Sequence, residues 1–322
     1  MSRRSRKKTS PLAILIVLVL CGIGGAAANF FGLFSELDIL TGASPLSNVP
    51  ESFAKAAQIY YIDVGQGDSQ LIRLNPDDSD PYDILIDAGT RSTKQELSAY
   101  LSELGVQNID LLIGTHPHED HIGGMAQIIE DFPIGTICLP ETSEKMTPTT
   151  KTYESLLDAI EEKDVPVTAA KAGTFLLKTD EVTLQILSPS HQDYDNLNDY
   201  SIVTRLVVGE KSFLFEGDAE AEVEQEILDA GYDVSCDVLK LGHHGSSTSS
   251  SAAYLKAANP EFAVISCGVD NDYGHPHRET MERLQKLSIQ EYRTDKQKTL
   301  LAETDGKTIQ WTTGLHSVID AA

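Results

Sequence analysis

Cysteine is scarce in this sequence, and the few cysteines are far apart. Of the four, only Cys138, Cys236 and Cys267 lie beyond residue 34, and an odd number at wide spacing excludes a disulfide framework and a thiolate metal cage. We therefore expect these three to be small, buried apolar side chains. The sequence also lacks repeats of fixed period and low-complexity blocks, which excludes a solenoid architecture.

Positive charge is scarce as well. The 322 residues contain 25 Lys and Arg against 49 Asp and Glu, giving a net charge of -24. Residues 35–322 contain no basic stretch interleaved with aromatic residues. Such a chain should repel phosphate polymers, which argues against strong nonspecific binding of duplex DNA unless metal ions or a local patch offset the field.

The N-terminal residues 1–34 differ from the rest of the chain. Five cations lie in the first eight residues, followed by an uncharged run over residues 9–35 that is longer than the roughly 20 residues needed to span a bilayer. We predict a transmembrane signal-anchor with a cytoplasmic N-terminus. A cleaved signal peptide is the alternative, because the small residues at 26–28 fit a cleavage site.

Three segments are therefore expected: the anchor or signal peptide over residues 1–34, a linker over residues 35–56, and one domain over residues 57–322. The domain would lie outside the cell membrane on a single-pass anchor, or be secreted if the signal is cleaved. Early hairpin-like runs followed by alternating strands and helices predict an α/β fold with two sheets and helices outside them. The expected helices cover residues 93–104, 153–162, 219–230, 251–258 and 279–287. The expected strands cover residues 109–113, 136–139, 182–187, 201–208, 212–215, 234–241 and 262–266.

The motif "THPHEDH", residues 115–121, holds three of the nine histidines and follows an apolar strand. In extended backbone the imidazoles of His116 and His118 point the same way, whereas Asp120 and His121 turn toward a second point. Two glycines follow at 123–124 and are expected to allow a tight turn into the next helix. Nitrogen and carboxylate donors in two adjacent groups predict two divalent metal ions, Zn²⁺ or Mn²⁺. A polar turn rich in histidine by chance is the alternative.

The motif and its companions resemble the metallo-β-lactamase superfamily. The runs "DVGQGDS", "THPHEDHIGG", "FEGDAE", "LKLGHHGSSTS" and "YGHP" are closest to the hydrolase domain of ComEC-type DNA-uptake channel proteins and their stand-alone relatives. The resemblance covers residues 58 to about 312 and leaves out the multi-helix channel. It implies a four-layer αββα sandwich.

The resemblance also assigns roles to individual residues. Asp87 would hold the metal loop by hydrogen bonds, although an ordinary strand-end turn is the alternative. Asp218 would bridge the two metals, with the N-cap of the following helix as the alternative. One of His243 and His244 would bind the second metal, and the other would contact the substrate. The implied metal ligands are His116, His118, Asp120, His121, Asp218 and one or both of His243 and His244. The implied catalytic residues are Asp120, His275 and Asp87, with His275 at the site rim.

Further residues are candidates for substrate contact. Asp68 and Ser69 lie on a glycine-rich turn that could equally be a plain hairpin turn. Asn198 and Ser201 form the Asn-x-x-Ser element of ComEC-type relatives, and Ser246 follows the histidine pair. Many superfamily members have a further histidine between the main motif and the bridging aspartate, but this interval contains only His191. We therefore expect His116, His118 and Asp218 to hold the first metal with water or a weaker ligand.

The predicted reaction is hydrolysis of a phosphodiester, because a bridging water between two cations can attack in line without a Ser or Cys nucleophile. The substrate would be single-stranded DNA or a small or cell-wall phosphodiester, with a competence channel as a partner. The few available cations would be Lys240, Arg278 and Arg293. Alternatives are hydrolysis of a non-phosphate ester, lactone or β-lactam, a non-catalytic exported metal-binding module, and an inactive assembly partner in DNA uptake.

Overall fold

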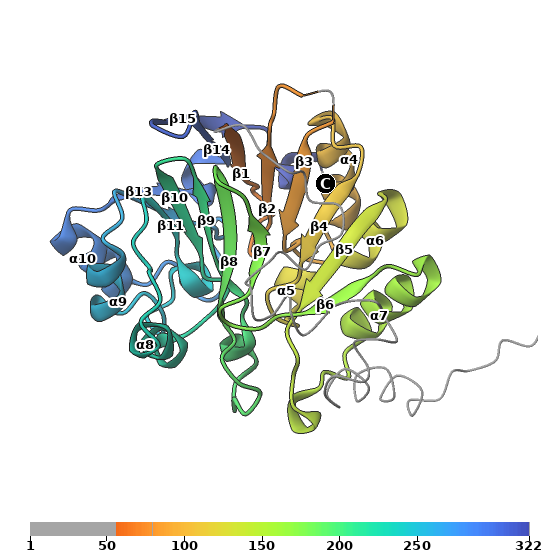
Figure 1. The fold of residues 1–322 in the computed structure, drawn as a ribbon, viewed down its shortest axis with the longest axis horizontal. Helices are drawn as coiled ribbons and strands as arrows, with labels where there is room; N and C mark the ends of the chain where they lie inside the picture. The colour runs from red at the N-terminus through yellow and green to blue at the C-terminus, as the bar shows by residue number, and fades with distance from the viewer. Residues whose placement is uncertain (1–55, 79, 322) are drawn as a thin grey trace, which may run out of the picture.

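The computed structural model describes residues 56–78 and 80–321, in which two β-sheets pack face to face with helices on both outer sides (Figure 1). The eight-stranded sheet has the order β15-β14-β1-β2-β3-β4-β5-β6, and the seven-stranded sheet has the order β13-β12-β11-β10-β9-β8-β7. The predicted anchor or signal peptide over residues 1–34 lies outside the described residues. No helix among residues 56–78 and 80–321 has the length and apolar character to cross a membrane.

The strands of the first sheet are β1 (Ala57–Tyr61), β2 (Gln70–Leu74), β3 (Tyr82–Ile86), β4 (Ile109–Ile113), β5 (Ile134–Leu139), β6 (Val167–Ala169), β14 (Thr299–Thr304) and β15 (Ile309–Leu315). Those of the second are β7 (Phe175–Lys178), β8 (Val182–Ser188), β9 (Val203–Val208), β10 (Lys211–Phe215), β11 (Val238–Lys240), β12 (Phe262–Ile265) and β13 (Gln290–Arg293). The α-helices are α4 (Lys94–Glu103), α5 (Glu119–Ile122), α6 (Met125–Asp131), α7 (Lys151–Lys163), α8 (Ala221–Asp229), α9 (Ala252–Ala258), α10 (Arg278–Leu287) and α11 (Thr294–Gln297). Short 3₁₀ turns are η1 (Glu144–Met146), η2 (Leu197–Tyr200), η3 (Gly242–Gly245) and η4 (Val318–Ala321).

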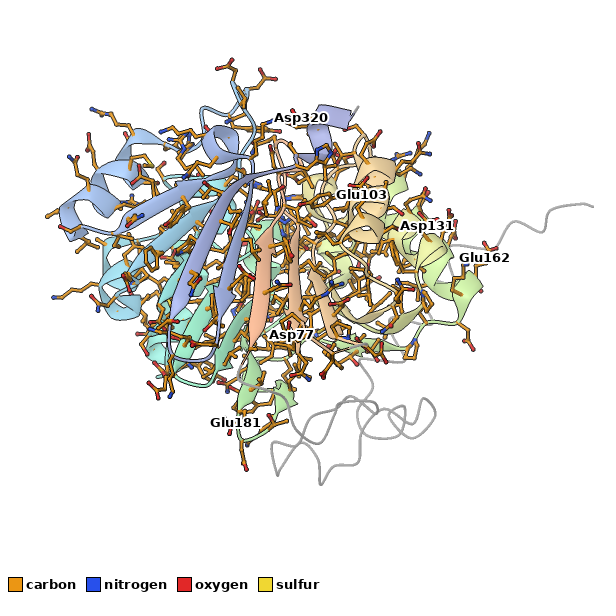
Figure 2. The ribbon with its side chains drawn as sticks, turned by 90° about the horizontal axis from the view of Figure 1, so that it is seen from above. Asp77, Glu103, Asp131, Glu162, Glu181 and Asp320 are labelled. Carbon is orange, nitrogen blue, oxygen red and sulfur yellow. The ribbon has the colours of Figure 1, made fainter. Side chains whose placement is uncertain are left out.

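Three apolar cores hold the layers together. The central core lies between the sheets and contains Tyr61, Ile84 and Phe215 among others. A second core joins the first sheet to α4, α6 and α7, and a third joins the second sheet to α8, α9 and α10. The order of layers is therefore helix, sheet, sheet, helix, as the resemblance implied. Acidic side chains such as Glu103, Asp131 and Glu162 extend from the outer helices into solvent, where their charges stay hydrated (Figure 2).

The parallel strands of both sheets bring five loops to one edge of the sandwich. Strands β3 to β6 are parallel in the first sheet, and β10 to β13 are parallel in the second. Because loops after parallel strands emerge at the same edge, the segments that follow β3, β4, β10, β11 and β12 meet there. These segments carry the polar residues that the sequence singled out.

Most of the listed helices and strands are observed within two residues of their expected ends, but one strand is much shorter than expected. The strand expected over residues 234–241 is confined to Val238–Lys240. Gly123 and Gly124 form the expected turn from α5 into α6, and their φ values of -58° and -88° are open to any residue. Glycine is needed at position 124 for another reason, because a Cβ there would overlap the carbonyl oxygen of Ala88 where two backbones pack closely.

Candidate metal centre

The first cluster of potential metal ligands consists of His116, His118 and Asp218, whose ligand atoms all lie within 4.8 Å of one another. Nε2 of His116 is 3.0 Å from Nδ1 of His118 and 3.7 Å from Oδ2 of Asp218. Nδ1 of His116 is 3.2 Å from the hydroxyl of Thr115, which itself donates to Asp87. That hydroxyl therefore accepts a hydrogen bond from Nδ1 of His116, and the lone pair of Nε2 faces the cluster.

The second cluster consists of Asp120, His121 and His244. Oδ2 of Asp120 lies 3.2 Å from Nε2 of His244. Nδ1 of His121 donates to Oδ2 of Asp87 at 2.7 Å, and Nδ1 of His244 donates to the carbonyl of Ser266 at 3.0 Å. Hydrogen bonds of this kind fix the tautomer of metal-binding histidines in proteins. Here they leave the Nε2 atoms of both histidines directed toward the cluster.

Asp218 lies between the two clusters. Its Oδ1 is 3.1 Å from Nε2 of His121 and 3.7 Å from Nε2 of His244, whereas its Oδ2 faces His116. Among the described residues, Oδ1 of Asp218 and Nε2 of His121 are both buried without a hydrogen-bond partner. Two lone-pair atoms at this distance repel each other unless a proton or a cation lies between them. The residues therefore fit a pair of divalent cations bridged by Asp218.

The electrostatics of the clusters also favour cations. Burial lowers the pKa values of His116 and His118, which keeps both imidazoles neutral and available as ligands. Burial opposes ionisation of Asp218, but His121 and His244 outweigh it and lower the pKa of this carboxyl. Burial likewise disfavours a charged His121, yet Asp218 and Asp87 raise the pKa of this imidazole. Protons and cations therefore compete for the same buried site.

Asp87 supports the metal loop as the resemblance implied. It is fully buried and has a left-handed backbone, with φ of 57°. Its carboxylate accepts hydrogen bonds from the backbone N–H and the hydroxyl of Thr115, at 2.8 Å and 2.7 Å, and from His121. These contacts join the end of β3 to the motif after β4, which an ordinary strand-end turn would not require.

The two histidines after β11 face different clusters. Both have left-handed backbone angles, with φ of 50° for His243 and 54° for His244, and this turn sends the side chains apart. His244 is buried and lies beside Asp120 in the second cluster. His243 is partly exposed, and its Nε2 lies 3.8 Å from Oδ2 of Asp218 on the side of the first cluster. The geometry therefore favours His244 as the second-metal ligand.

Glu220 is a residue of the site that sequence reasoning missed. Its Oε1 is 3.3 Å from Nδ1 of His243 and accepts hydrogen bonds from Asn198 and Thr248, each at 3.1 Å. The hydrogen bond to His243 is the main reason that the pKa of Glu220 is lowered. The sequence feature that could have indicated Glu220 as a site residue is its place in "GDAE", two residues after Asp218. Glu220 is also the N-cap residue of α8, so Asp218 does not have that alternative role.

Four of the five residues expected to contact substrate make hydrogen bonds or ion pairs within the protein. Asp68 is buried in an ion pair with Lys240 at 2.8 Å, and the hydroxyl of Ser69 donates to the carbonyl of Asp87. The hydroxyl of Ser201 accepts the backbone N–H of Asp218 at 3.0 Å, and Ser246 is buried beside Thr248. These side chains hold the loops of the site in place. They face protein atoms because a hydroxyl beside a tight turn satisfies nearby backbone groups.

Asn198 remains a candidate for substrate contact. Its side-chain amide nitrogen donates to Glu220, while Oδ1 is buried without a partner among the described residues. The three cations expected near the site differ in their exposure. Lys240 is buried in its ion pair, and Arg293 pairs with Asp295 at 2.6 Å. Arg278 also lies near a carboxylate, 3.5 Å from Glu282, but its side chain is 79% exposed, so it alone of the three is accessible to an anion from solvent.

His275 lies at the rim of the clusters. Its ring centroid is 5.5 Å from that of His243 and 6.0 Å from that of His244. Burial, followed by the nearby His244, lowers the pKa of His275 to about 4, so the imidazole is neutral at neutral pH. Its Nδ1 is buried without a partner among the described residues, which leaves this nitrogen available to a bound ligand.

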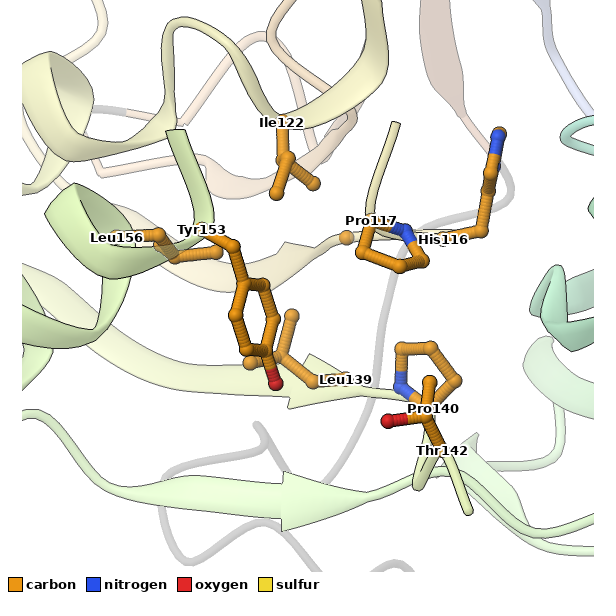
Figure 3. A pocket seen from close by; sticks show the side chains of 9 residues that line it. His116, Pro117, Ile122, Leu139, Pro140, Thr142, Tyr153 and Leu156 are labelled. Atoms are coloured by element: carbon orange, nitrogen blue, oxygen red, sulfur yellow. The ribbon is translucent and has the colours of Figure 1, made fainter. Parts of the chain in front are cut away.

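A small, mostly apolar cavity lies between the loop of the motif and the residues of β5 and α7. It is lined by Pro117, Ile122, Leu139, Tyr153 and other residues of β5 and α7, and the imidazole of His116 points away from it (Figure 3). Packing on one side of the loop and ligand atoms on the other fix the direction of the imidazole.

The fold and the two clusters are those of the αββα class of hydrolases with candidate metal-binding residues, and the chain belongs to the metallo-beta-lactamase superfamily, whose family model matches residues 62–269. Three of its curated relatives are competence proteins of the ComEC type. It is 31% identical over 264 residues to ComE operon protein 3 of Bacillus subtilis, covering 76% of this chain and 32% of that protein. It is 30% identical over 289 residues to competence protein ComA of Neisseria gonorrhoeae, covering 89% and 38%.

A third relative is Recombination protein 2 of Haemophilus influenzae, with 33% identity over 234 residues, 71% of this chain and 26% of that protein. The chain thus spans about a third of the length of these curated relatives. Among solved structures, a metallo hydrolase from Ignicoccus hospitalis, Igni18, aligns with a TM-score of 0.48 and 17% identity over 76% of this chain and 98% of that one.

Proposed function

We propose that this chain is a phosphodiesterase that uses two divalent cations, Zn²⁺ or Mn²⁺, as cofactors. The observation that carries the proposal is the buried pair of ligand atoms, Oδ1 of Asp218 and Nε2 of His121, which lie 3.1 Å apart between two clusters of imidazoles and carboxylates. When bound there, two divalent cations would lower the pKa of a water molecule and stabilise the charge that develops on a phosphoryl group. The family membership supports the same chemistry.

Each cluster residue has a defined task in this proposal. His116 and His118 would hold the first cation, Asp120, His121 and His244 would hold the second, and Asp218 would be a ligand shared by both. Asp87 fixes the proton of His121 on Nδ1. His275 presents a neutral imidazole at the rim, where its free Nδ1 can hydrogen-bond the leaving-group oxygen.

The charge of the molecule favours a short substrate. The acidic outer helices would repel a long duplex, and Arg278 is the exposed cation among the three expected near the site. Single-stranded DNA or a small or cell-wall phosphodiester fits these conditions better. The competence proteins among the relatives favour DNA, so we place the activity in DNA uptake, with a competence channel as partner.

We further propose that the N-terminal segment places the domain outside the cell membrane, either on a single-pass anchor or after cleavage. The basic cluster and the uncharged run at residues 9–35 support this arrangement. N-terminal sequencing of the mature protein and protease accessibility in intact cells test it. An uncleaved chain that is shielded from external protease would contradict it.

A non-catalytic metal-binding module is the second candidate. It is favoured by the first cluster, which offers only three close protein ligands among the residues that the structure describes. The one histidine between His121 and Asp218 in the sequence is His191, which pairs with Glu226 at the surface and does not join this cluster. One tightly bound metal without turnover would support this candidate.

The test uses the full-length chain loaded with Mn²⁺ or Zn²⁺. Bis(p-nitrophenyl) phosphate and single-stranded DNA are the substrates, and metal content is measured on the same samples. We expect metal-dependent hydrolysis that Asp120→Ala abolishes and that the exposed control Asp131→Ala retains. A folded chain with two metals and no hydrolysis of either substrate would refute the proposed activity.

A further inference from the structure

The loop between β12 and α10 forms one wall of the site, and its backbone is tightly braced. The amide nitrogen of Asn271 donates to the carbonyls of Gly268 and His275, at 3.0 Å and 2.7 Å, and its Oδ1 accepts the N–H of His275 at 2.9 Å. His277 accepts the N–H of Ser247 through Nδ1, so its Nε2 donates to the carbonyl of Tyr273 at 3.2 Å. The loop therefore has one defined conformation.

This loop holds two of the three large hydrophobic side chains that are markedly exposed in the described part of the chain. Val269 is 61% exposed and Tyr273 is 67% exposed, whereas the third, Leu287, lies on α10. A single exposed apolar residue needs no explanation, but two on one braced loop beside a catalytic centre do. The loop hydrogen bonds use the carbonyl of Tyr273, so they do not account for its ring.

The ring of Tyr273 continues a series of rings that begins in the second metal cluster. The rings of His244 and His275 lie 6.0 Å apart at an angle of 25°, and those of His275 and Tyr273 lie 5.6 Å apart at 21°. His275 thus separates the metal ligand from the tyrosine, and the outer surface of the tyrosine is open to solvent. A planar group attached to a phosphoryl group at the metals could reach this surface.

The charges on the loop restrict what that group can be. Asp270 and Asp272 are exposed on the same loop, three residues and one residue before Tyr273, so a second phosphate is disfavoured there. A neutral planar group has no such penalty. The planar neutral group that a biological phosphodiester carries is a nucleobase, which stacks on aromatic side chains irrespective of its identity.

We propose that Tyr273 forms a stacking subsite for a nucleobase next to the scissile phosphodiester, so that the enzyme selects nucleotide phosphodiesters over esters without a base. This inference rests on the proposed function. Stacking of one base contributes about 1 to 3 kcal/mol, which corresponds to a preference of roughly 5- to 140-fold.

The test compares two substrates that share one leaving group. Thymidine 5′-(p-nitrophenyl phosphate) and methyl p-nitrophenyl phosphate differ in whether a nucleoside or a methyl group is attached to the phosphoryl group. The ratio of their kcat/KM values is measured for the full-length, Mn²⁺-loaded chain, for Tyr273→Ala, for Tyr273→Phe and for the control Leu287→Ala. Effects of a variant on the chemical step cancel in this ratio.

We expect the thymidine preference to fall by roughly 5- to 140-fold in Tyr273→Ala and to remain in Tyr273→Phe and Leu287→Ala. An unchanged ratio in Tyr273→Ala would overturn the subsite and leave the phosphodiesterase standing. A calorimetric comparison of the binding of thymidine 5′-monophosphate and of methyl phosphate tests the subsite even if the chain has no phosphodiesterase activity. If wild type hydrolyses neither substrate, a Tyr273-dependent preference for the nucleotide supports the subsite, and equal binding by wild type and Tyr273→Ala overturns it.

Discussion

Replacing Asp87 with asparagine should weaken binding of the second metal by reversing the tautomer of His121. The carboxylate accepts hydrogen bonds from Thr115 N–H, the Thr115 hydroxyl and Nδ1 of His121. Burial raises the pKa of Asp87, whereas the nearby His121 and the hydrogen bonds from His121 and Thr115 oppose this shift and favour the carboxylate. An asparagine keeps one acceptor and places an NH₂ group near His121. That group donates to Nδ1, which moves the imidazole proton to Nε2, where the metal would bind.

The magnitude follows from the contacts. Removing such a support from a metal-bound histidine typically costs 10- to 100-fold in metal affinity, or about 1.4 to 2.7 kcal/mol. The assay is a competitive titration of the metal-free chain with Zn²⁺ in the presence of a chromophoric chelator. We expect one site to weaken by this amount and the other to keep its affinity.

Asp229→Asn is the matched control, because this carboxylate is exposed at the end of α8 and accepts from Gln225. It should bind both metals as the wild type does. The reasoning is refuted if Asp87→Asn binds two Zn²⁺ ions with wild-type affinities, since the tautomer would then have no bearing on the site.

Three further predictions concern stability and folding. Burial raises the pKa of Asp110 to about 6, above the value near 3.9 of an unfolded chain, so the stability contributed by the protonated carboxyl is lost as the pH rises from about 4 to 6. In urea unfolding of the metal-free chain, the free energy of unfolding of Asp110→Asn should therefore rise relative to that of wild type across this window. A difference that stays constant with pH contradicts this prediction. Arg73→Met should lower the free energy of unfolding by about 3 to 5 kcal/mol, because Asp83, 2.8 Å away, stays buried without its partner; a loss below 1 kcal/mol contradicts this. Gly124→Ala should lower both the melting temperature and the metal content, because the new Cβ meets the carbonyl of Ala88, and unchanged values of both would refute the close packing.

Much of the fold could be predicted because the buried strands are short apolar runs flanked by turn residues. The strand expected over residues 109–113 matches β4 in full, and the helix expected over 93–104 matches α4 within one residue at each end. Strands β6, β7, β13, β14 and β15 escaped prediction. Three of them, β6, β7 and β13, have only three or four residues, and the mostly polar side chains of β13 give no clear apolar period.

The metal clusters could be predicted because their ligands lie close together in the sequence or after strands. His116, His118, Asp120 and His121 come from one heptapeptide, which the fold needs only to keep extended and then turn. The substrate contacts remain a prediction. Whether the hydroxyl of Ser69 faces a ligand or a backbone carbonyl depends on the register of two loops, which no local pattern encodes.

The same limit applies to the pair of histidines. Sequence left open which of His243 and His244 faces the second metal, because the answer depends on two consecutive left-handed residues. Such backbone angles are uncommon outside glycine and arise from packing around the loop. Glu220 was missed for a related reason, since its partners Asn198 and Thr248 are 22 and 28 residues away in the chain.

The order of strands in the first sheet has a consequence for biosynthesis. The strand that opens the domain, β1, pairs with β14, and the register joins Ala57 to Thr304. This side of the sheet therefore stays unpaired until almost the whole domain has left the ribosome, and loop closure over such a separation is slow. An exposed apolar strand edge during that interval favours aggregation. A nascent chain that ends before residue 299 would lack β14 and is expected to depend on chaperones or on export in an unfolded form.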